Sequence, residues 1–189
     1  MKGLRLRLPL RLHLVRHLAP LVAPGVCYGR SDLEVDPVLN ASMAPALRQR
    51  LPMGAPLYAS PLQRCAQLAA GLHPAPVLDA RLAELNFGSW ELRPWADIAR
   101  ADVDAWAADM AHYRPGGGES VAMMAQRVAA FYDELAAGAA PEAIVVCHAG
   151  TIRLLAARAR GLGLAAMAHD AASRPHAIGY GEIIVLDCV

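Results

Sequence analysis

The chain has 189 residues, a formal net charge of +1 at pH 7, and a composition that is 56% hydrophobic but only 5% aromatic. That length fits a single domain spanning residues 1–189. The small net charge gives no strong electrostatic attraction to nucleic acid or to an acidic membrane. The alanine-rich composition favours helices packed on a sheet. No apolar run approaches the roughly 20 residues of a membrane span, and four dispersed cysteines without Cys-x-x-Cys spacing predict reduced thiols in a cytoplasmic protein rather than a zinc ribbon.

The first predicted element is a strand that ends at Val15 and is followed at once by Arg16 and His17. Arginines interrupt every apolar stretch of the basic segment 1–14, which makes it a poor signal peptide and a better strand. Ligands bind at the carboxyl ends of strands in open α/β sheets, so Arg16 and His17 are predicted at the rim of a crevice. Taken alone, such a pair is more often a surface arginine and a partly buried histidine that share no function. The rest of the chain favours a shared functional site instead.

A long loop over residues 18–37 follows, marked by prolines and glycines. Loops of that length inside a compact domain are usually functional rather than idle. A helix is predicted over 41–51, a short second strand over 57–59 and a weak third strand over 77–78.

Ser60 and Pro61 have the sequence of a helix N-cap and first helical position, and Gly71 stands near the expected end of that helix. Arg64 falls in the first turn, where it interrupts no apolar stripe and lies beside the end of the preceding strand.

The middle of the chain predicts a small helical lid insert at about residues 90–119. Residues 82–90 read as a loop with aromatic side chains on either side of a glycine, and residues 90–113 hold all three tryptophans. The run Arg-Pro-Gly-Gly-Gly-Glu over 114–119 is a clear break. The tryptophans are expected to pack the insert together, and a sharper possibility is that they shape a leaving-group pocket.

The last third predicts a long helix over 120–137, an apolar strand over 143–147, a helix over 152–160 and a strand over 183–186 that runs antiparallel at an edge of the sheet. The central strand runs straight into His148. Alternation of strands and helices predicts an α/β fold, a three-layer α/β/α sandwich with a mostly parallel sheet and one antiparallel edge strand.

If the predicted strands are neighbours, their ends bring His17, His148, Arg16 and Arg64 to one crevice, together with the amide-rich start of a helix that can bind an anion. A neutral imidazole can attack phosphorus, and guanidinium forks match phosphate oxygens and stabilise the developing charge. Glu84, in a loop able to reach the site, supplies the proton to the leaving oxygen. Four basic groups already provide positive charge, so neither a metal nor a cofactor is expected.

These motifs together resemble the histidine phosphatase, or phosphoglycerate mutase-like, superfamily. The resemblance implies that His17 is the nucleophile, that Arg16, Arg64 and His148 contact phosphate, and that Glu84 rather than Glu91 is the proton donor. It covers nearly the whole chain in the right order, over residues 15–17, 60–65, 84–91, 115–120 and 146–153.

Residues 25–32 resemble the α-ribazole phosphatase-like branch, which acts late in cobalamin nucleotide-loop assembly, and the resemblance adds Tyr28 and Ala149 to the substrate-binding residues. The family usually has glycine, a small or acidic residue and then Ser or Thr after the nucleophile, where this chain has Leu18, Ala19 and Pro20. That departure weakens analogy with mutases, whose longer inserts and tail are also missing here.

Alternatives stay open at this point. The enzyme could act on sugar phosphates or phosphoglycerates, or could be a mutase that needs a bisphosphate primer, and a non-enzymatic alternative is a phospholigand-binding module. A zinc site on His13, His17 and His148 is disfavoured by the nearby arginines and by the lack of a carboxylate or cysteine partner. The expected partner is a small phosphorylated metabolite, without nucleic acid or membrane, for a monomer or a homodimer.

Other polar side chains are expected to be structural. Arg153 is expected on the helix surface or paired with a carboxylate, and Glu119 at a turn or helix start; Arg30 and Asp32 are weak candidates for leaving-group contact. The remaining histidines are expected in solvent or in loops, and they are His73, His112, His169 and His176. His176 could also line the crevice.

Overall fold

The computed structural model describes residues 10–173 and 177–188, in which five strands form one mixed sheet. The strand order is β3–β2–β4–β1–β5, with β5 antiparallel to β1 and every other pair parallel. The α/β fold with one antiparallel edge strand is therefore confirmed. The strand bounds are β1 Leu10–Arg16, β2 Leu57–Ala59, β3 Val77–Leu78, β4 Glu142–Cys147 and β5 Ile183–Cys188.

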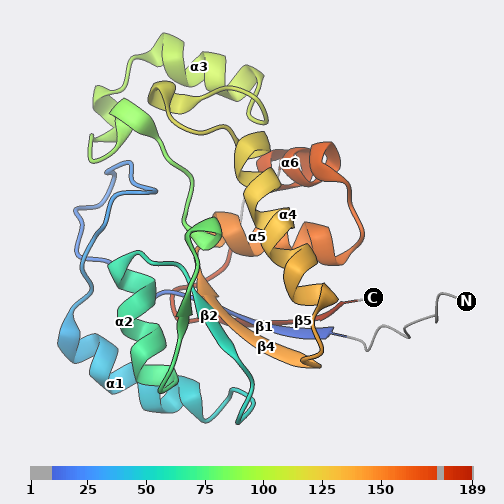
Figure 1. Ribbon diagram of the computed structural model, residues 1–189. Coiled ribbons are helices and arrows are strands. Elements are labelled where there is room, and N and C mark those ends of the chain that lie inside the picture. Colours follow the sequence, from blue (N-terminus) through green and yellow to red (C-terminus); the bar gives the residue numbers. More distant parts are fainter. Residues whose placement is uncertain (1–9, 174–176, 189) are drawn as a thin grey trace, which may run out of the picture.

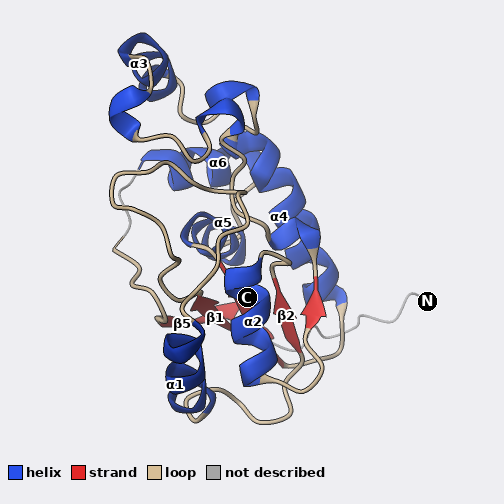
Figure 2. Cartoon of the chain, turned by 90° about the vertical axis from the view of Figure 1, so that its left-hand side faces the viewer, coloured by secondary structure: helices blue, strands red, loops and turns tan. Residues whose placement is uncertain are grey.

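Helices cover both faces of the sheet, as Figure 1 shows. One layer holds α1 (Pro37–Arg48) and α2 (Gln63–Leu72); the other holds α4 (Val121–Ala137), α5 (Ala149–Ala159) and α6 (Leu164–Ser173). Helix α3 (Arg100–Ala108) lies far from the sheet, at the end of the excursion over residues 90–119 (Figure 2). None of the helices in the described ranges is long and apolar enough to cross a membrane.

The two central strands, β1 and β4, pack against a helical layer on each face. All of their residues are buried except Arg11, His13, Arg16 and Glu142. Leu12 and Leu14 of β1 belong to the core under α4, α5 and α6, whereas Val15 and its β4 neighbours Ile144 and Val146 belong to the core under α1 and α2. This alternation is the period-two pattern of a strand between two layers.

The parallel register brings three strand ends to one edge. Arg16 lies opposite Cys147, and the amide of His17 continues the ladder by donating to the carbonyl of Cys147 at 3.1 Å. On the other side of β4, the amide of Ser60 donates to the carbonyl of Val146 at 3.0 Å. The residues that follow β1, β2 and β4 are therefore neighbours.

Helix α1 begins four residues before its predicted start at 41 and ends at Arg48 rather than 51. The Asp36 side chain accepts a hydrogen bond of 2.8 Å from the amide of Val38, and Pro37 occupies the first helical position. The prediction was wrong here because Asp-Pro was assigned to the loop, although it is a sequence that starts helices.

The predicted N-cap at Ser60 was also wrong. Helix α2 begins at Gln63, with Leu62 as an N-cap that makes no side-chain hydrogen bond. The predicted helix over 152–160 starts earlier, at Ala149, and β1 extends one residue beyond Val15. Helix α6 was not predicted at all, because the alanine-rich segment carries few apolar markers of periodicity.

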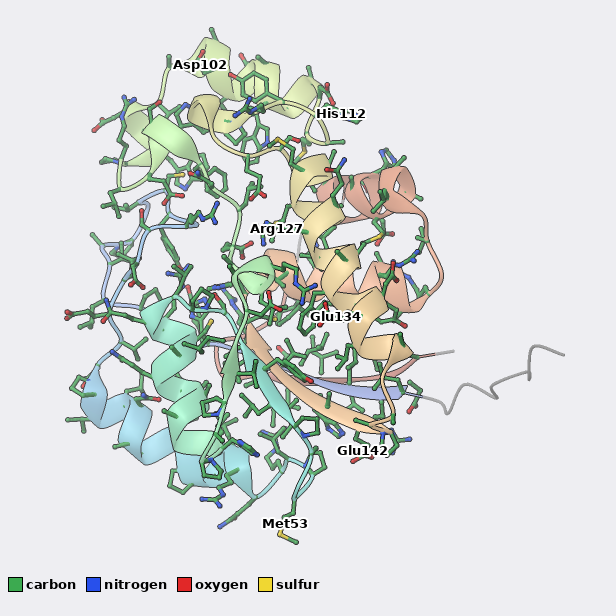
Figure 3. All side chains as sticks on the ribbon, in the orientation of Figure 1. Met53, Asp102, His112, Arg127, Glu134 and Glu142 are labelled. Atoms are coloured by element: carbon green, nitrogen blue, oxygen red, sulfur yellow. The ribbon has the colours of Figure 1, made fainter. Side chains whose placement is uncertain are left out.

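The excursion is held together by its aromatic side chains. The rings of Trp95 and Trp106 stack with centroids 5.9 Å apart and planes 6° from parallel, and Trp90 packs edge-on against both. Figure 3 shows Asp102 and His112 at the outer end of this unit. The expectation that the tryptophans pack the insert together agrees with these contacts.

The base of the excursion is a close backbone contact between two glycine-containing turns. A Cβ at Gly88 would lie 2.2 Å from the carbonyl oxygen of Gly116, and a Cβ at Gly118 would lie 2.1 Å from that of Asn86. The amide of Glu119 donates to the same Asn86 carbonyl at 2.8 Å. The loop that carries Glu84 is therefore fixed against residues 115–119.

We expect Gly116→Ala to destabilise the fold more than Gly117→Ala does. Both glycines have positive φ, 57° and 74°, so both changes carry a left-handed backbone cost of about 1–2 kcal/mol. Only at Gly116 would the new Cβ collide with backbone, 2.3 Å from the carbonyl oxygen of Phe87, which adds roughly 1–3 kcal/mol. Urea unfolding measures both variants, and equal losses would contradict the packing argument.

Candidate active site

A cavity of about 630 Å³ opens at the carboxyl ends of β1, β2 and β4. Its charged lining includes Arg16, His17, Arg64 and Glu84. Much of the remaining wall is apolar and is formed by Phe87, Trp106, Met110, Val121, Met124 and Leu154. The cavity therefore offers contacts both to a charged group and to an apolar group.

His17 is held in one orientation and one tautomer. Its Nδ1 lies 2.7 Å from the carbonyl oxygen of Leu18, and because a carbonyl only accepts, we assign the proton to Nδ1 and the lone pair to Nε2. The side chain is almost fully buried, and this burial lowers the pKa of His17 to about 3. The hydrogen bond with Leu18 acts in the opposite direction, whereas the charges of Arg64 and Arg16 lower the pKa further. The ring is thus neutral at physiological pH.

His148 is the second imidazole of the site, with its ring centroid 5.0 Å from that of His17. Its Nε2 lies 2.8 Å from the hydroxyl oxygen of Ser60. Burial, followed by interaction with the neighbouring His17 ring and with the charge of Arg64, lowers the pKa of His148 well below its usual value. Ser60, predicted as a helix cap, instead orients this ring.

Arg64 is fully buried and only partly satisfied. Its Nη1 donates to the carbonyl of Ser31 at 2.7 Å and its Nη2 to that of Gly29 at 2.5 Å. Its Nε has no acceptor among the described residues. A buried cation with unused donors is stabilised by an anion that supplies the missing acceptors.

Arg16 shows the same pattern. Its Nη1 donates to the carbonyl of Ile178, and its guanidinium carbon lies 3.9 Å from the centre of the Tyr180 ring. Within the described ranges its Nε is likewise buried without an acceptor. Two guanidiniums with unused N–H groups therefore lie close enough to His17 for their charges to lower its pKa.

Glu91 is a structural carboxylate that holds the loop beneath Arg64. Burial opposes ionisation, but the hydrogen bonds from Ser31 and from backbone amides outweigh it and lower the pKa of Glu91. By accepting from this loop, Glu91 fixes the two carbonyls that orient Arg64. Its donors, at 2.6–3.1 Å, are the amides of Gly29, Arg30, Ser31 and Phe87 and the Ser31 hydroxyl.

Glu84 occupies the N-terminus of α5, where the sequence had suggested that free amides would meet phosphate. Its Oε2 accepts from the amide of Gly150 at 3.1 Å and its Oε1 from the amide of Leu85 at 3.0 Å. A Cβ at Gly150 would lie 2.4 Å from Oε1, so glycine is the residue that leaves room for this carboxylate.

Arg127, which sequence reasoning missed, anchors the backbone of the Glu84 loop from α4 (Figure 3). It donates to the carbonyls of Arg81, Ala83 and Glu84 at 2.7, 2.6 and 3.2 Å. The other side of its guanidinium pairs with both oxygens of Glu119 at 2.8 Å. This agrees with the expectation that Glu119 is a structural carboxylate near a helix start.

The structure also places the remaining candidates. Tyr28 and Ala149 line the cavity, as does Arg153, which the sequence had assigned to the helix surface or to a carboxylate. Burial lowers the pKa of Arg153, against the charges of Asp170 and Glu84. The only sequence signal for its position is its place one turn into the helix after Ala149.

Other candidates lie elsewhere. Asp32 caps α2 by accepting from the amide of Gln63 at 2.7 Å, and the Arg30 side chain is exposed. His13 approaches Glu142 at 4.0 Å rather than the two active-site histidines, and the described ranges contain no cluster of three or more His, Cys, Asp or Glu that could hold a metal. His176 lies outside the described residues.

Comparisons with known proteins agree on one family. The model of the histidine phosphatase superfamily (branch 1) matches residues 12–178. The adenosylcobalamin/α-ribazole phosphatase of Escherichia coli is 35% identical over 112 residues, which are 57% of this chain and 55% of that enzyme, so the match spans little more than half of this relative's length.

Two solved structures are similar over most of both chains. The mycobacterial glucosyl-3-phosphoglycerate phosphatase is 27% identical with a TM-score of 0.75, over 93% of this chain and 88% of that one. The α-ribazole phosphatase of Shigella flexneri is 25% identical with a TM-score of 0.78, over 94% and 90%. The fold is thus shared with phosphatases of different substrates.

We expect the unfolding free energy to fall as pH drops below about 6.5. His17 stays neutral in the folded state down to its pKa of about 3, whereas the unfolded chain takes up the proton near 6.5, so stability rises with pH in this window. His17→Asn removes one such titration and should make the slope shallower by up to about 1.4 kcal/mol per pH unit.

Urea unfolding at several pH values between 4 and 8 measures this slope. His112→Asn, at the exposed outer end of the excursion, is the control and should leave it unchanged. An unchanged slope in His17→Asn would show that the folded state does not keep this ring neutral.

Proposed function

The chain belongs to the histidine phosphatase superfamily (branch 1), and from that premise we propose that it hydrolyses phosphomonoesters through a phosphohistidine formed on His17. The observation that carries this proposal is the setting of His17. The tautomer assigned to His17 leaves the lone pair on Nε2, the pKa of the ring is low, and two guanidiniums with unused donors lie near it. This arrangement suits an anionic electrophile better than any cation.

In the first step, Nε2 of His17 attacks phosphorus in line and the bond from phosphorus to the leaving oxygen breaks. Arg16, Arg64 and His148 contact the equatorial oxygens, where charge accumulates. Glu84, in its protonated form, gives its proton to the departing alkoxide, a type of help worth roughly 100- to 10,000-fold in rate.

In the second step, the Glu84 carboxylate takes a proton from water, whose oxygen attacks the phosphohistidine. The bond from phosphorus to nitrogen breaks, phosphate leaves and neutral His17 is restored. Glu84 is then protonated again, ready for the next substrate. All charge neutralisation comes from side chains, so we propose that the reaction needs no metal.

The apolar wall of the cavity favours a leaving group with a flat apolar part. Phe87, Trp106 and Met124 lie on that wall, and α-ribazole carries an apolar benzimidazole on a ribose. We therefore propose α-ribazole 5′-phosphate as the substrate class, which is also what the names of the E. coli and Shigella relatives indicate.

A second candidate substrate class is favoured by one side chain. Arg153 lines the same cavity beside Glu84, and its positive charge suits a leaving group with a carboxylate. The mycobacterial relative acts on such a compound, glucosyl-3-phosphoglycerate. Phosphoglycerates and sugar phosphates are therefore included as substrates in the assay described below.

We place the reaction in the cytoplasm, on a small phosphorylated metabolite. All four cysteines are free thiols, which fits a reducing compartment. The chain is proposed to act as a monomer or a homodimer.

His17→Asn should abolish turnover of an aryl phosphate, by more than about a thousandfold, because the nucleophile is lost. Rapid acid-free quenching of wild-type protein with radiolabelled substrate should show a labelled chain that is stable in base and labile in acid. His17→Asn should show no label, and His73→Asn should behave like wild type. Turnover that persists in His17→Asn, or a label of ester-type stability, would refute the phosphohistidine.

We expect kcat/KM for α-ribazole 5′-phosphate to exceed that for glucosyl-3-phosphoglycerate, 3-phosphoglycerate and simple sugar phosphates, with and without a chelator. Trp106→Leu should lower kcat/KM for α-ribazole 5′-phosphate about tenfold, because the apolar contact area shrinks. Arg153→Met should change it little. The reverse ranking, with Arg153→Met as the damaging variant, would favour a carboxylate-bearing substrate, and isomerisation of phosphoglycerate after bisphosphate priming would favour a mutase.

A further inference from the structure

The loop over residues 177–182 wraps the end of β1 and presents Tyr180 to the active site. The amide of Arg16 donates to the carbonyl of Glu182 at 3.0 Å, and the amide of Gly181 donates to the carbonyls of Arg16 and His17 at 3.1 and 3.3 Å. Gly181 has φ +71°, which turns the chain sharply at this point. Tyr180 is therefore fixed to the same strand end that carries the nucleophile.

The ring of Tyr180 covers one face of the Arg16 guanidinium. The distance from Arg16 Cζ to the ring centre is 3.9 Å, and the same ring lies 5.6 Å from that of His17. Because Nη1 is tied to the carbonyl of Ile178 and one face is covered, the edge formed by Nε and Nη2 is left for a ligand. That edge is the fork that matches two oxygens of a phosphate.

A second tyrosine extends this contact to the other arginine. The hydroxyl oxygens of Tyr180 and Tyr28 lie 2.8 Å apart, and the Tyr28 ring lies 5.7 Å from Arg64 Cζ. Burial, followed by the hydrogen bond to Tyr180, raises the pKa of Tyr28, so its hydroxyl keeps its proton. The four side chains form a continuous chain in the order Arg16, Tyr180, Tyr28, Arg64.

Aromatic and carbonyl partners suit these arginines for a physical reason. A carboxylate partner would compete with phosphate for the guanidinium N–H groups, and neither Arg16 nor Arg64 takes part in any ion pair between described residues. A ring face attracts the cation electrostatically but consumes none of its donors. The two rings thus immobilise the guanidiniums while leaving their hydrogen-bonding edges available.

We propose that Tyr180 and Tyr28 are positioning residues that hold the Arg16 and Arg64 guanidiniums in the orientation that binds the phosphoryl group, with Tyr180 acting through Arg16. This inference rests on the proposed phosphatase function. It assigns Tyr28 to support of Arg64 and of Tyr180, in addition to its place on the cavity wall.

Tyr180→Ala should weaken oxyanion binding roughly two- to fivefold, the ratio that the loss of a cation–π contact at an exposed side chain produces. The readouts are KM for an aryl phosphate and the inhibition constants of inorganic phosphate and vanadate, with kcat changing less than KM. Tyr180→Phe keeps the ring over Arg16 and should recover most of the affinity. Val185→Ala, at an exposed position on β5, is the control for substitution near this edge.

A double-mutant cycle separates positioning from a general structural role. In an Arg16→Met background, Tyr180→Ala should add little further loss of phosphate affinity, because the residue through which it acts is gone. Thermal unfolding of each variant checks that the fold is retained. Additive losses, an unchanged inhibition constant in Tyr180→Ala, or a Tyr180→Phe variant as weak as Tyr180→Ala would each overturn the inference.

The two proposals fail in different ways. A wild-type protein that neither hydrolyses aryl phosphates nor binds inorganic phosphate overturns the phosphatase proposal and this one together. A wild-type protein that is active, beside a Tyr180→Ala variant with unchanged KM and phosphate inhibition, overturns only the role of Tyr180.

Discussion

The register of β4 between β1 and β2 is the constraint on which the site depends. Arg16 pairs with Cys147, and the amides of His17 and Ser60 continue the ladders beyond the strands, so three chain segments leave the sheet side by side. Side chains alternate between faces, so a slip of one residue would send the His17 ring to the opposite layer. Burial of β1 and β4 between two helical layers makes such a slip expensive, because every apolar side chain would change sides.

The charged side chains around this edge fall into two groups, one that holds loops in place and one that is available to a ligand. Glu91 accepts hydrogen bonds from backbone amides and fixes the loop beneath Arg64. Glu119 pairs with Arg127 and so helps to fix the loop of Glu84. The two arginines beside His17 have carbonyl and aromatic partners instead, and both retain buried donors without acceptors in the described part of the chain. Because both imidazoles are held neutral, the positive charge of this end resides in guanidiniums, whose geometry suits an oxyanion.

The position of Glu84 couples the sheet to the excursion. Its carboxylate accepts a hydrogen bond from the first turn of α5, and its carbonyl accepts one from Arg127 of α4. The backbone of its loop packs against the backbone of the turn at residues 115–119. The same excursion supplies Trp106 to the apolar wall of the cavity. This loop therefore sets both the distance of the Glu84 carboxylate from His17 and the shape of the space beside it.

The sequence by itself determined the fold class, the edge strand and the segments that carry the site, because apolar periodicity and strand-ending polar residues are local signals. It also named side chains that do surround one cavity, among them His17, Arg64 and Glu84, whose roles stay predictions. Only the tertiary structure decided that Ser60 orients His148 instead of capping a helix, that Arg153 faces the cavity, and that Arg127 and Tyr180 support the site. Those roles depend on contacts between segments far apart in the chain, and no local pattern of residues encodes which distant carbonyl, ring or hydroxyl a side chain will meet once the layers pack.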